Sequence, residues 1–198
     1  MELDDIKAAG FTGRSGHPGL YDVLRHVCRL KSPRTYLEIG MYDGASVVTV
    51  ITHSPHLQKI VGCDIFGNDW RNWQGGTNAE APAHITQAVR KAGYFKELEV
   101  LVGDSAKAIP NLREKFDLIL IDGDHAAEPA RTDFLNCWPL LNDSGILVFD
   151  DCRFASVEPV MKEIHNRGMS HIITVDDEWH DATSAFMRGD LWTYKHAV

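Results

Sequence analysis

The chain has 198 residues, of which 44% are hydrophobic and 24% charged, a length and composition typical of one globular domain. These values exclude a disordered chain, a collagen-like chain and a small disulfide scaffold. With 20 basic and 28 acidic residues the formal net charge is −8, which disfavours nucleic acid or an anionic membrane as main partner and suits a cationic small ligand.

The cysteines and the start of the chain favour a reducing compartment. The four cysteines are Cys28, Cys63, Cys137 and Cys152. They lie far apart in apolar surroundings and form no C-x-x-C pair, so we expect buried thiols. The acidic start is unlike a signal peptide, and no segment reaches the roughly 18 apolar residues of a membrane span. We therefore expect one cytoplasmic domain over 1–198, with a loose N-terminal segment at 1–18.

Hydrophobic spacing predicts alternating helices and strands after residue 18. In chain order we expect a helix at 19–30, a strand at 35–39, a helix at 46–53, a strand at 59–64, a helix at 79–93, a strand at 98–103, a brief helix or turn at 105–112, a strand at 116–121, a helix at 129–141, a strand at 145–149, a helix at 158–167, and strands at 171–175 and 183–188. Residues 191–194 are a candidate extension of the last strand.

This alternation predicts an α/β fold with a doubly wound, Rossmann-like sheet of seven strands, mostly parallel, with helices on both faces. Short apolar strands separated by helices are typical of a parallel sheet that is covered on both sides. No helix separates the last two strands, so we expect them to form an antiparallel hairpin at the sheet edge.

Acidic residues follow five successive predicted strands. They are Glu38 in the first strand, Asp64 after the second, Asp104 after the third, Asp122 and Asp124 (with Gly123 and His125) after the fourth, and Asp150 and Asp151 after the fifth. Open α/β sheets bind ligands outside the carboxyl ends of their strands. One or two such acids could simply be helix N-caps, but five in register favour a binding site.

The first strand leads into the turn E-I-G-M-Y-D-G, residues 38–44. A dinucleotide fingerprint would have glycine where Glu38 stands, and a carboxylate there would repel a pyrophosphate. It would attract an ammonium or sulfonium instead, while Gly40 and Gly44 let a ligand approach the backbone. This turn therefore argues against an NAD-binding or nucleotide-binding enzyme.

Asp64 lies about twenty residues after the turn, where an acid can accept both ribose hydroxyls. Asp104 suits an acceptor for the adenine edge, with Ser105 offering a backbone N–H. The alternatives are a simple strand-end turn for Asp64 and the N-cap of the next helix for Asp104. Together these positions call for adenosine, a cationic centre, an amino-acid tail and no phosphate, which S-adenosylmethionine provides.

The chain resembles the class I S-adenosylmethionine-dependent methyltransferases over residues 19–195. Y-L-E-I-G-M-Y-D-G, V-G-C-D and V-G-D-S look like the family's first three motifs, and F-D-L-I-L-I-D-G-D-H with the later P-L-L … G-I-L-V-F-D-D resembles the small, cation-dependent O-methyltransferase subgroup. The cofactor-binding residues that the resemblance implies are Glu38, Gly40, Asp43, Gly44, Ser46, Asp64, Ile65, Asp104, Ser105, Asp122 and Gly123.

The resemblance also implies a metal. In the cation-dependent relatives an acid after the fourth strand and a pair after the fifth hold magnesium, and Asp122, Asp150 and Asp151 match those positions. Mg²⁺ prefers hard oxygen ligands, and bound to a hydroxyl it lowers that group's pKa. Alternatively, Asp122 contacts the methionine end of the cofactor, and Asp150 and Asp151 cap a loop.

His125 is the candidate base, because its usual pKa suits proton removal near neutral pH. It could instead pack against the adenine or a loop, and Asp124 could orient it. With Asp122 it forms the predicted catalytic pair.

Residues 66–78 form a long polar and aromatic loop in which Trp70, Arg71 and Trp73 could close over a substrate. The alternative is packing on a helix or on another subunit. Trp179 and His180 could form another wall of the pocket.

The sequence thus predicts a methyltransferase that acts on a hydroxyl of a small molecule with S-adenosylmethionine and Mg²⁺ or another divalent cation, with a homodimer as one option. A metal-independent enzyme that methylates oxygen or nitrogen, and a non-catalytic protein that binds S-adenosylmethionine, remain as alternatives.

Overall fold

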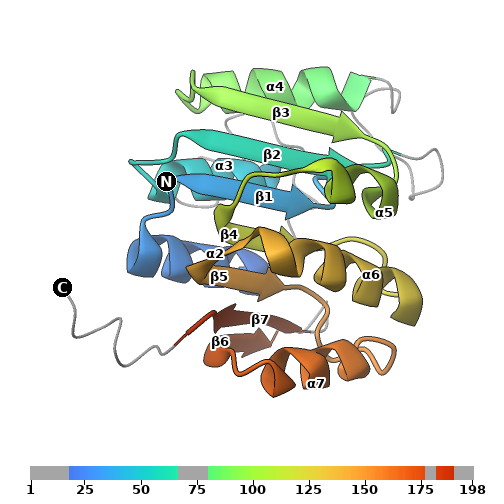
Figure 1. Cartoon of the computed structure of the whole chain (residues 1–198). Helices are drawn as coiled ribbons and strands as arrows, with labels where there is room; N and C mark the ends of the chain where they lie inside the picture. Colours follow the sequence, from blue (N-terminus) through green and yellow to red (C-terminus); the bar gives the residue numbers. More distant parts are fainter. Residues whose placement is uncertain (1–17, 67–79, 177–181, 190–198) are drawn as a thin grey trace.

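Seven strands form one sheet in the computed structural model, which describes residues 18–66, 80–176 and 182–189 (Figure 1). They are β1 (Thr35–Ile39), β2 (Lys59–Asp64), β3 (Glu97–Val102), β4 (Phe116–Ile121), β5 (Leu141–Phe149), β6 (Ser170–Asp176) and β7 (Ala182–Met187). Their order is β3-β2-β1-β4-β5-β7-β6. Strands β1 to β5 run parallel, and β7 pairs antiparallel with both β5 and β6. The predicted fold class and the antiparallel hairpin at the sheet edge are confirmed.

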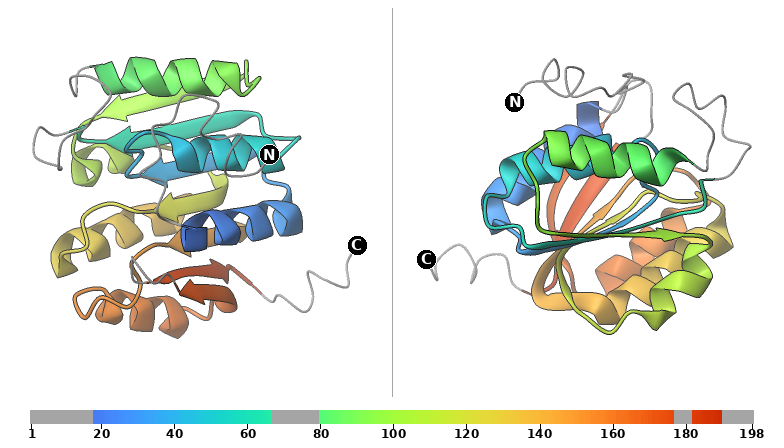
Figure 2. Two further views of the ribbon diagram at one scale, coloured as in Figure 1. Left: turned by 180° about the vertical axis from the view of Figure 1, so that it is seen from behind. Right: turned by 90° about the horizontal axis from the view of Figure 1, so that it is seen from above.

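Helices of the described chain cover both faces of the sheet (Figure 2). On one face lie α2 (Pro18–Lys31), α3 (Ala45–His53) and α4 (Ala81–Lys91), and on the other α5 (Ser105–Ala108), α6 (Ala127–Cys137) and α7 (Glu158–Asn166). Two short 3-10 helices, η2 (Ile109–Asn111) and η3 (Trp138–Leu140), follow α5 and α6. In the ranges that the structure describes, no helix combines the length and the apolarity that a membrane crossing requires.

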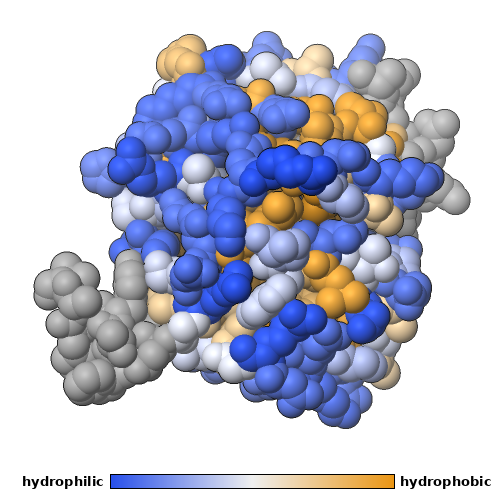
Figure 3. Space-filling model, in the orientation of Figure 1, coloured by the Kyte–Doolittle hydropathy of each residue, from blue (hydrophilic) through white to orange (hydrophobic). Residues whose placement is uncertain are grey.

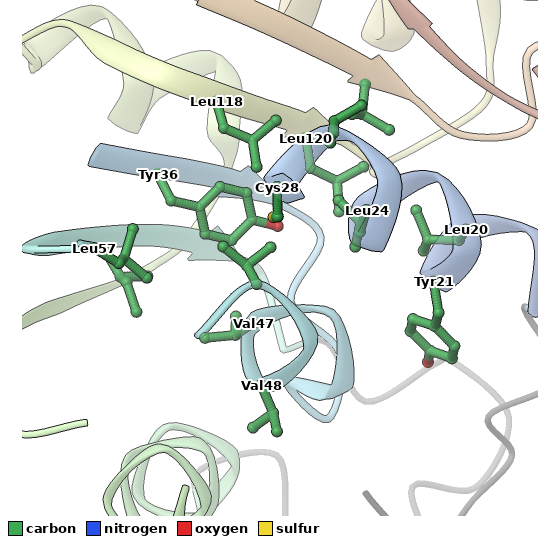
Figure 4. Packing of buried hydrophobic residues seen from close by; sticks show 14 of the residues in the cluster. Leu20, Tyr21, Leu24, Cys28, Tyr36, Val47, Val48, Leu57, Leu118 and Leu120 are labelled. Atoms are coloured by element: carbon green, nitrogen blue, oxygen red, sulfur yellow. The ribbon is translucent and has the colours of Figure 1, made fainter. Parts of the chain in front are cut away.

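The core consists of two layers, one on each face of the sheet. Because side chains of a strand alternate between faces, Tyr36 of β1 joins the layer beside α2 and α3, and the next residue, Leu37, joins the layer beside α6 and α7. Figure 4 shows the first layer, in which aliphatic side chains of α2 and α3 pack onto Tyr36. The face drawn in Figure 3 is largely hydrophilic, with hydrophobic surface in patches. All four cysteines are free and buried, as predicted.

The largest difference from the predicted boundaries lies between α6 and β5. The helix ends at Cys137 rather than at residue 141, because Pro139 has no N–H to donate and the chain tightens into η3. Strand β5 begins at Leu141 rather than at residue 145, since Leu141 already pairs with Phe116 ahead of a register irregularity. The polar residues 142–144 are typical of a turn, and for that reason the predicted strand starts too late.

The turn after β1 packs directly against the end of β4. Gly40 has a φ of 86°, and a Cβ atom added to it would lie 1.8 Å from the carbonyl oxygen of Asp122. The Gly40 N–H donates to the Cys63 carbonyl at 2.9 Å, and the Asp122 N–H donates to the Ile39 carbonyl at 2.9 Å. These bonds hold the ends of β1, β2 and β4 together at a place where the backbones leave no room for a side chain. Gly44, at the start of α3, also has a positive φ, of 82°.

Replacing Gly40 tests this contact. We expect Gly40→Ala to lower the free energy of unfolding by about 3 kcal/mol or more, because strain at positive φ adds to a clash with backbone. Gly93→Ala is the matched control: Gly93 follows α4 with a φ of 83°, but nothing lies within 4 Å of an added Cβ. It should cost only about 1 kcal/mol. Urea unfolding measures both, and equal losses would contradict the packing argument.

Candidate active site

The acidic residues predicted at the strand ends gather at one edge of the sheet, toward which the arrowheads of β1 to β5 all point in Figure 1. The exposure and the hydrogen-bond partners of these carboxyls differ widely, however. Some are buried and hold the fold, and others remain at the rim.

Glu38 is the most deeply placed of these acids. Its side chain is 0% exposed, and its two oxygens accept hydrogen bonds from the hydroxyls of Tyr36, at 2.7 Å, and of Ser46. Burial raises the pKa of Glu38 to about 7, although both hydroxyls act to lower it. In this structure the carboxyl orients Ser46 at the start of α3, a role that the motif alone did not predict.

The turn after β1 is held in shape by two further acids. Asp64, at the end of β2, accepts the N–H groups of Tyr42 at 2.9 Å and of Phe66 at 2.7 Å. Asp43 accepts the N–H of Ala45 at 3.0 Å, and burial raises the pKa of Asp43. Because a carboxylate oxygen can accept more than one hydrogen bond, Asp64 still has acceptor capacity for the hydroxyls of a ligand.

Ile65 and Asp104 lie farther out along the same edge. The Ile65 side chain is 64% exposed beside Asp64, and it offers apolar surface to a flat ring. Asp104 accepts the N–H of Ala106 at 3.0 Å and pairs with Lys107 at 3.2 Å. It thus serves as the N-cap of α5, the alternative role that the sequence suggested.

Asp133 of α6 is a member of this edge that the sequence analysis missed. The Ser105 hydroxyl donates to Asp133 Oδ1 at 2.6 Å, and a Cβ on Gly123 would lie 3.1 Å from Asp133 Oδ2. The residue is 3% exposed, and burial raises its pKa to about 6. A signal was present in the sequence, because Asp133 shares the buried helix face of Ala130 and Phe134, where a carboxyl is unusual.

Asp122, Asp150 and Asp151 form the one group of three acids in the described chain that could hold a metal ion. Each offers an oxygen, and these oxygens lie within 4.8 Å of one another. Asp150 and Asp151 are 3% and 7% exposed, and the Thr183 hydroxyl donates to Asp150. Burial and mutual repulsion raise the pKa of Asp122 well above its usual value and that of Asp150 to about 6.

His125 lies next to this carboxyl group. Its Nε2 is 2.9 Å from an Asp151 oxygen, and its ring centroid is 5.6 Å from that of Phe154. The Ser156 hydroxyl donates to the His125 carbonyl at 2.7 Å and ties the two loops together. The hydrogen bond to Asp151 raises the pKa of His125. Asp124 accepts the N–H of Ala126, the residue before α6, at 2.8 Å.

The predicted lid and wall residues lie outside the described part of the chain. They are Trp70, Arg71, Trp73, Trp179 and His180, together with the candidate strand extension at 191–194 and residues 1–17 of the N-terminal segment. Of the predicted loop, Phe66 is described, and its N–H donates to Asp64.

The side chains at this edge of the sheet fit both the divalent cation and the cofactor that the sequence predicts. Three carboxylates within reach of one point, two of them buried, match the hard oxygen ligands that Mg²⁺ prefers. A ligand with a positive centre would meet Asp43 and Asp122 at the first turn, and one with vicinal hydroxyls would meet Asp64. Each of these contacts would offset the cost of holding carboxyls out of water.

The raised pKa of Glu38 makes stability depend on pH. The pKa of Glu38 is about 7 in the folded protein, against about 4.3 for an unfolded glutamate. The stabilisation by its proton is complete below the unfolded value and is lost as pH rises through about 7. We expect the free energy of unfolding to fall between about pH 5 and 8, and to fall less in Glu38→Gln. Urea unfolding at several pH values measures the slopes, and identical slopes would contradict the assignment.

Comparison with known proteins agrees with this geometry. A family model described as a methyltransferase domain matches residues 37–152. The fold is similar to that of the O-methyltransferase TomG from Streptomyces achromogenes involved in tomaymycin synthesis, solved with S-adenosylmethionine (TM-score 0.70, 17% identity, 96% of this chain and 92% of that chain). It is also similar to that of an O-methyltransferase from Bacillus cereus solved with S-adenosylhomocysteine (TM-score 0.66, 17% identity, 93% and 88%).

A polyamine aminopropyltransferase from Thermoanaerobacter sp. (strain X514) is 25% identical over 175 residues, which are 83% of this chain and 57% of that protein. The chain spans just over half the length of the curated relatives it matches. The match to the family model covers more than half of the chain, including the ends of β1, β2, β4 and β5. The chain therefore belongs to the methyltransferase domain family.

Proposed function

We propose that this protein transfers the methyl group of S-adenosylmethionine to a hydroxyl oxygen of a small molecule, with a divalent cation at Asp122, Asp150 and Asp151. The observation that carries the proposal is a group of three carboxyl oxygens, one from each of these aspartates, within 4.8 Å of one another. The group lies next to the turn after β1 that contains Gly40. A methyltransferase that needs no cation has no evident use for three carboxyls so close together, because their charges repel.

The cofactor would lie across the ends of β1, β2 and β3. Asp64 would accept the ribose hydroxyls, and Ile65 would pack on the adenine, beside Asp104 and Ser105. Glu38, Asp43 and Asp122 would place negative charge around the sulfonium and the ammonium. The remaining contacts would come from Gly40, Gly44, Ser46 and Gly123, at the two backbone segments that meet there.

The cation site would use oxygen ligands alone. When bound, the cation would stabilise negative charge on the acceptor oxygen as its proton leaves. Thr183 would orient Asp150 through its hydrogen bond, so that the carboxyl keeps one direction before and after binding.

His125 would take the proton of the acceptor hydroxyl. As the bond between the methyl carbon and sulfur breaks, the bond to the acceptor oxygen forms, and the cofactor leaves as the neutral thioether S-adenosylhomocysteine. Asp151 holds the imidazole at 2.9 Å and stabilises its protonated form. Holding oxygen and sulfonium in line supplies much of the rate, because an in-line displacement depends on positioning.

Other assignments differ in what they require of the acidic edge. A metal-independent methyltransferase, acting on oxygen or nitrogen, would bind the cofactor without a cation. A non-catalytic binding protein would bind it without turnover. The aminopropyltransferase relative suggests transfer of an aminopropyl group instead of a methyl group. In that case the carboxyl trio, Asp122, Asp150 and Asp151, would hold an amine instead of a metal.

Removing one carboxyl of the trio separates these assignments. In Asp151→Asn the charge is lost but the fold should persist, because asparagine tolerates the residue's φ of 50° as well as aspartate does. We expect the variant to bind S-adenosylhomocysteine as the wild type does and to lose at least about tenfold in Mg²⁺ affinity, as measured by isothermal titration calorimetry. Asp143→Asn is the matched control, at the opposite end of β5, and should change neither binding event.

Two results would contradict the proposal in different ways. Cofactor binding with no Mg²⁺ binding by the wild type would discard the cation and keep the methyltransferase. Equal Mg²⁺ affinity in the wild type and Asp151→Asn would show that the ion binds elsewhere. With both binding events established, a panel of hydroxylated and amine acceptors, assayed with and without Mg²⁺, would identify the atom that is methylated.

A further inference from the structure

Tyr21 lies on helix α2, which none of the sequence motifs includes, at the edge of the sheet where the cofactor is proposed to bind. Helix α2 ends at Lys31 and the next strand begins at Thr35, so the end of the helix lies beside the start of β1. The helix is about 20 Å long, and it therefore runs back along the sheet toward the carboxyl ends of the strands, as Figure 1 shows. Tyr21 lies in the first turn of α2, at that end.

The Tyr21 hydroxyl differs from those of the other buried tyrosines. The Tyr36 hydroxyl donates to Glu38 at 2.7 Å, and the Tyr94 hydroxyl donates to the Glu97 carbonyl at 3.1 Å. Tyr21 is 5% exposed, yet its hydroxyl makes no hydrogen bond within the described part of the chain. In Figure 4 this hydroxyl points away from the labelled aliphatic side chains. The hydroxyl is not sealed from solvent, and no described group binds it, so it is available to a ligand that enters this edge.

The charges around Tyr21 define which partner it suits. Besides burial, the carboxyls of Asp43, Asp122, Glu38 and Asp150 raise the pKa of Tyr21 far above its usual value, so the phenol stays a neutral donor. Those four acids suit the sulfonium and the ammonium of S-adenosylmethionine. They would repel its carboxylate, which needs a donor that carries no negative charge.

We propose that the Tyr21 hydroxyl donates a hydrogen bond to the α-carboxylate of the methionine moiety of S-adenosylmethionine. This inference rests on the proposed function and deepens it. It makes Tyr21 a specificity residue, because the hydroxyl distinguishes ligands that carry the carboxylate from ligands that lack it.

The test pairs one atom of the protein with one group of the ligand. Tyr21→Phe removes only the hydroxyl, and Tyr94→Phe removes a hydroxyl from a tyrosine of similar burial in the turn after α4. Calorimetry on the full chain compares S-adenosylhomocysteine with its decarboxylated analogue. We expect Tyr21→Phe to weaken S-adenosylhomocysteine about tenfold or more, as for a hydrogen bond to a charged group, and to leave the analogue unchanged.

Stability provides a second measurement that separates binding from folding. Because the Tyr21 hydroxyl has no partner among the described residues, Tyr21→Phe should not lower the unfolding temperature of the free protein, whereas Tyr94→Phe should lower it. Tyr94→Phe should bind both ligands as the wild type does.

The inference would be overturned if Tyr21→Phe bound S-adenosylhomocysteine as tightly as the wild type, or if it weakened both ligands equally. Either result would leave the proposed function intact. If the wild type bound neither ligand, the proposed function would fail and this inference with it.

Discussion

The contact between Gly40 and the Asp122 carbonyl is the constraint on which the site depends. A strand that ended in any other residue would be pushed away from β4, because a Cβ there would lie 1.8 Å from that oxygen. The close approach brings Glu38, two residues before the glycine, near Asp122 at the end of β4. The other acids of the site reach the same place because the carboxyl ends of parallel strands share one edge of the sheet. Binding chemistry and backbone packing are thus parts of one arrangement.

Burying several carboxyls close together lowers the stability of the protein when no ligand is bound. Burial raises the pKa of Glu38 to about 7 and those of Asp133 and Asp150 to about 6, so these groups are partly protonated near neutral pH. The structure reduces the cost with hydroxyl donors, namely Tyr36 and Ser46 on Glu38, Ser105 on Asp133 and Thr183 on Asp150. A cationic ligand would favour the charged forms, so ligand binding, proton release and stability should be linked.

Most of the fold could be predicted because its signals are local. Apolar runs bounded by glycine and proline marked the strands, and β5 was misplaced where residues 142–144 continue a strand in spite of turn-like composition. At the site, the acids after β1, β2, β4 and β5 were predictable from their register. Tyr21 and Asp133 were not identified, because each comes from a helix whose buried face looks like ordinary core. Their proximity to the edge is a tertiary property, set by how α2 and α6 pack on the sheet. The burial of Glu38 likewise depends on Tyr36 and Ser46, whose orientation no motif encodes.

The proposed chemistry depends most on a divalent cation held by Asp122, Asp150 and Asp151 beside the cofactor. Crystals of the protein grown with S-adenosylhomocysteine and Mn²⁺, which shares the oxygen preference of Mg²⁺, would test it by anomalous scattering. We expect one strong anomalous peak within about 2.5 Å of an oxygen from each of the three carboxylates. A structure with S-adenosylhomocysteine bound and no peak at this trio would contradict it.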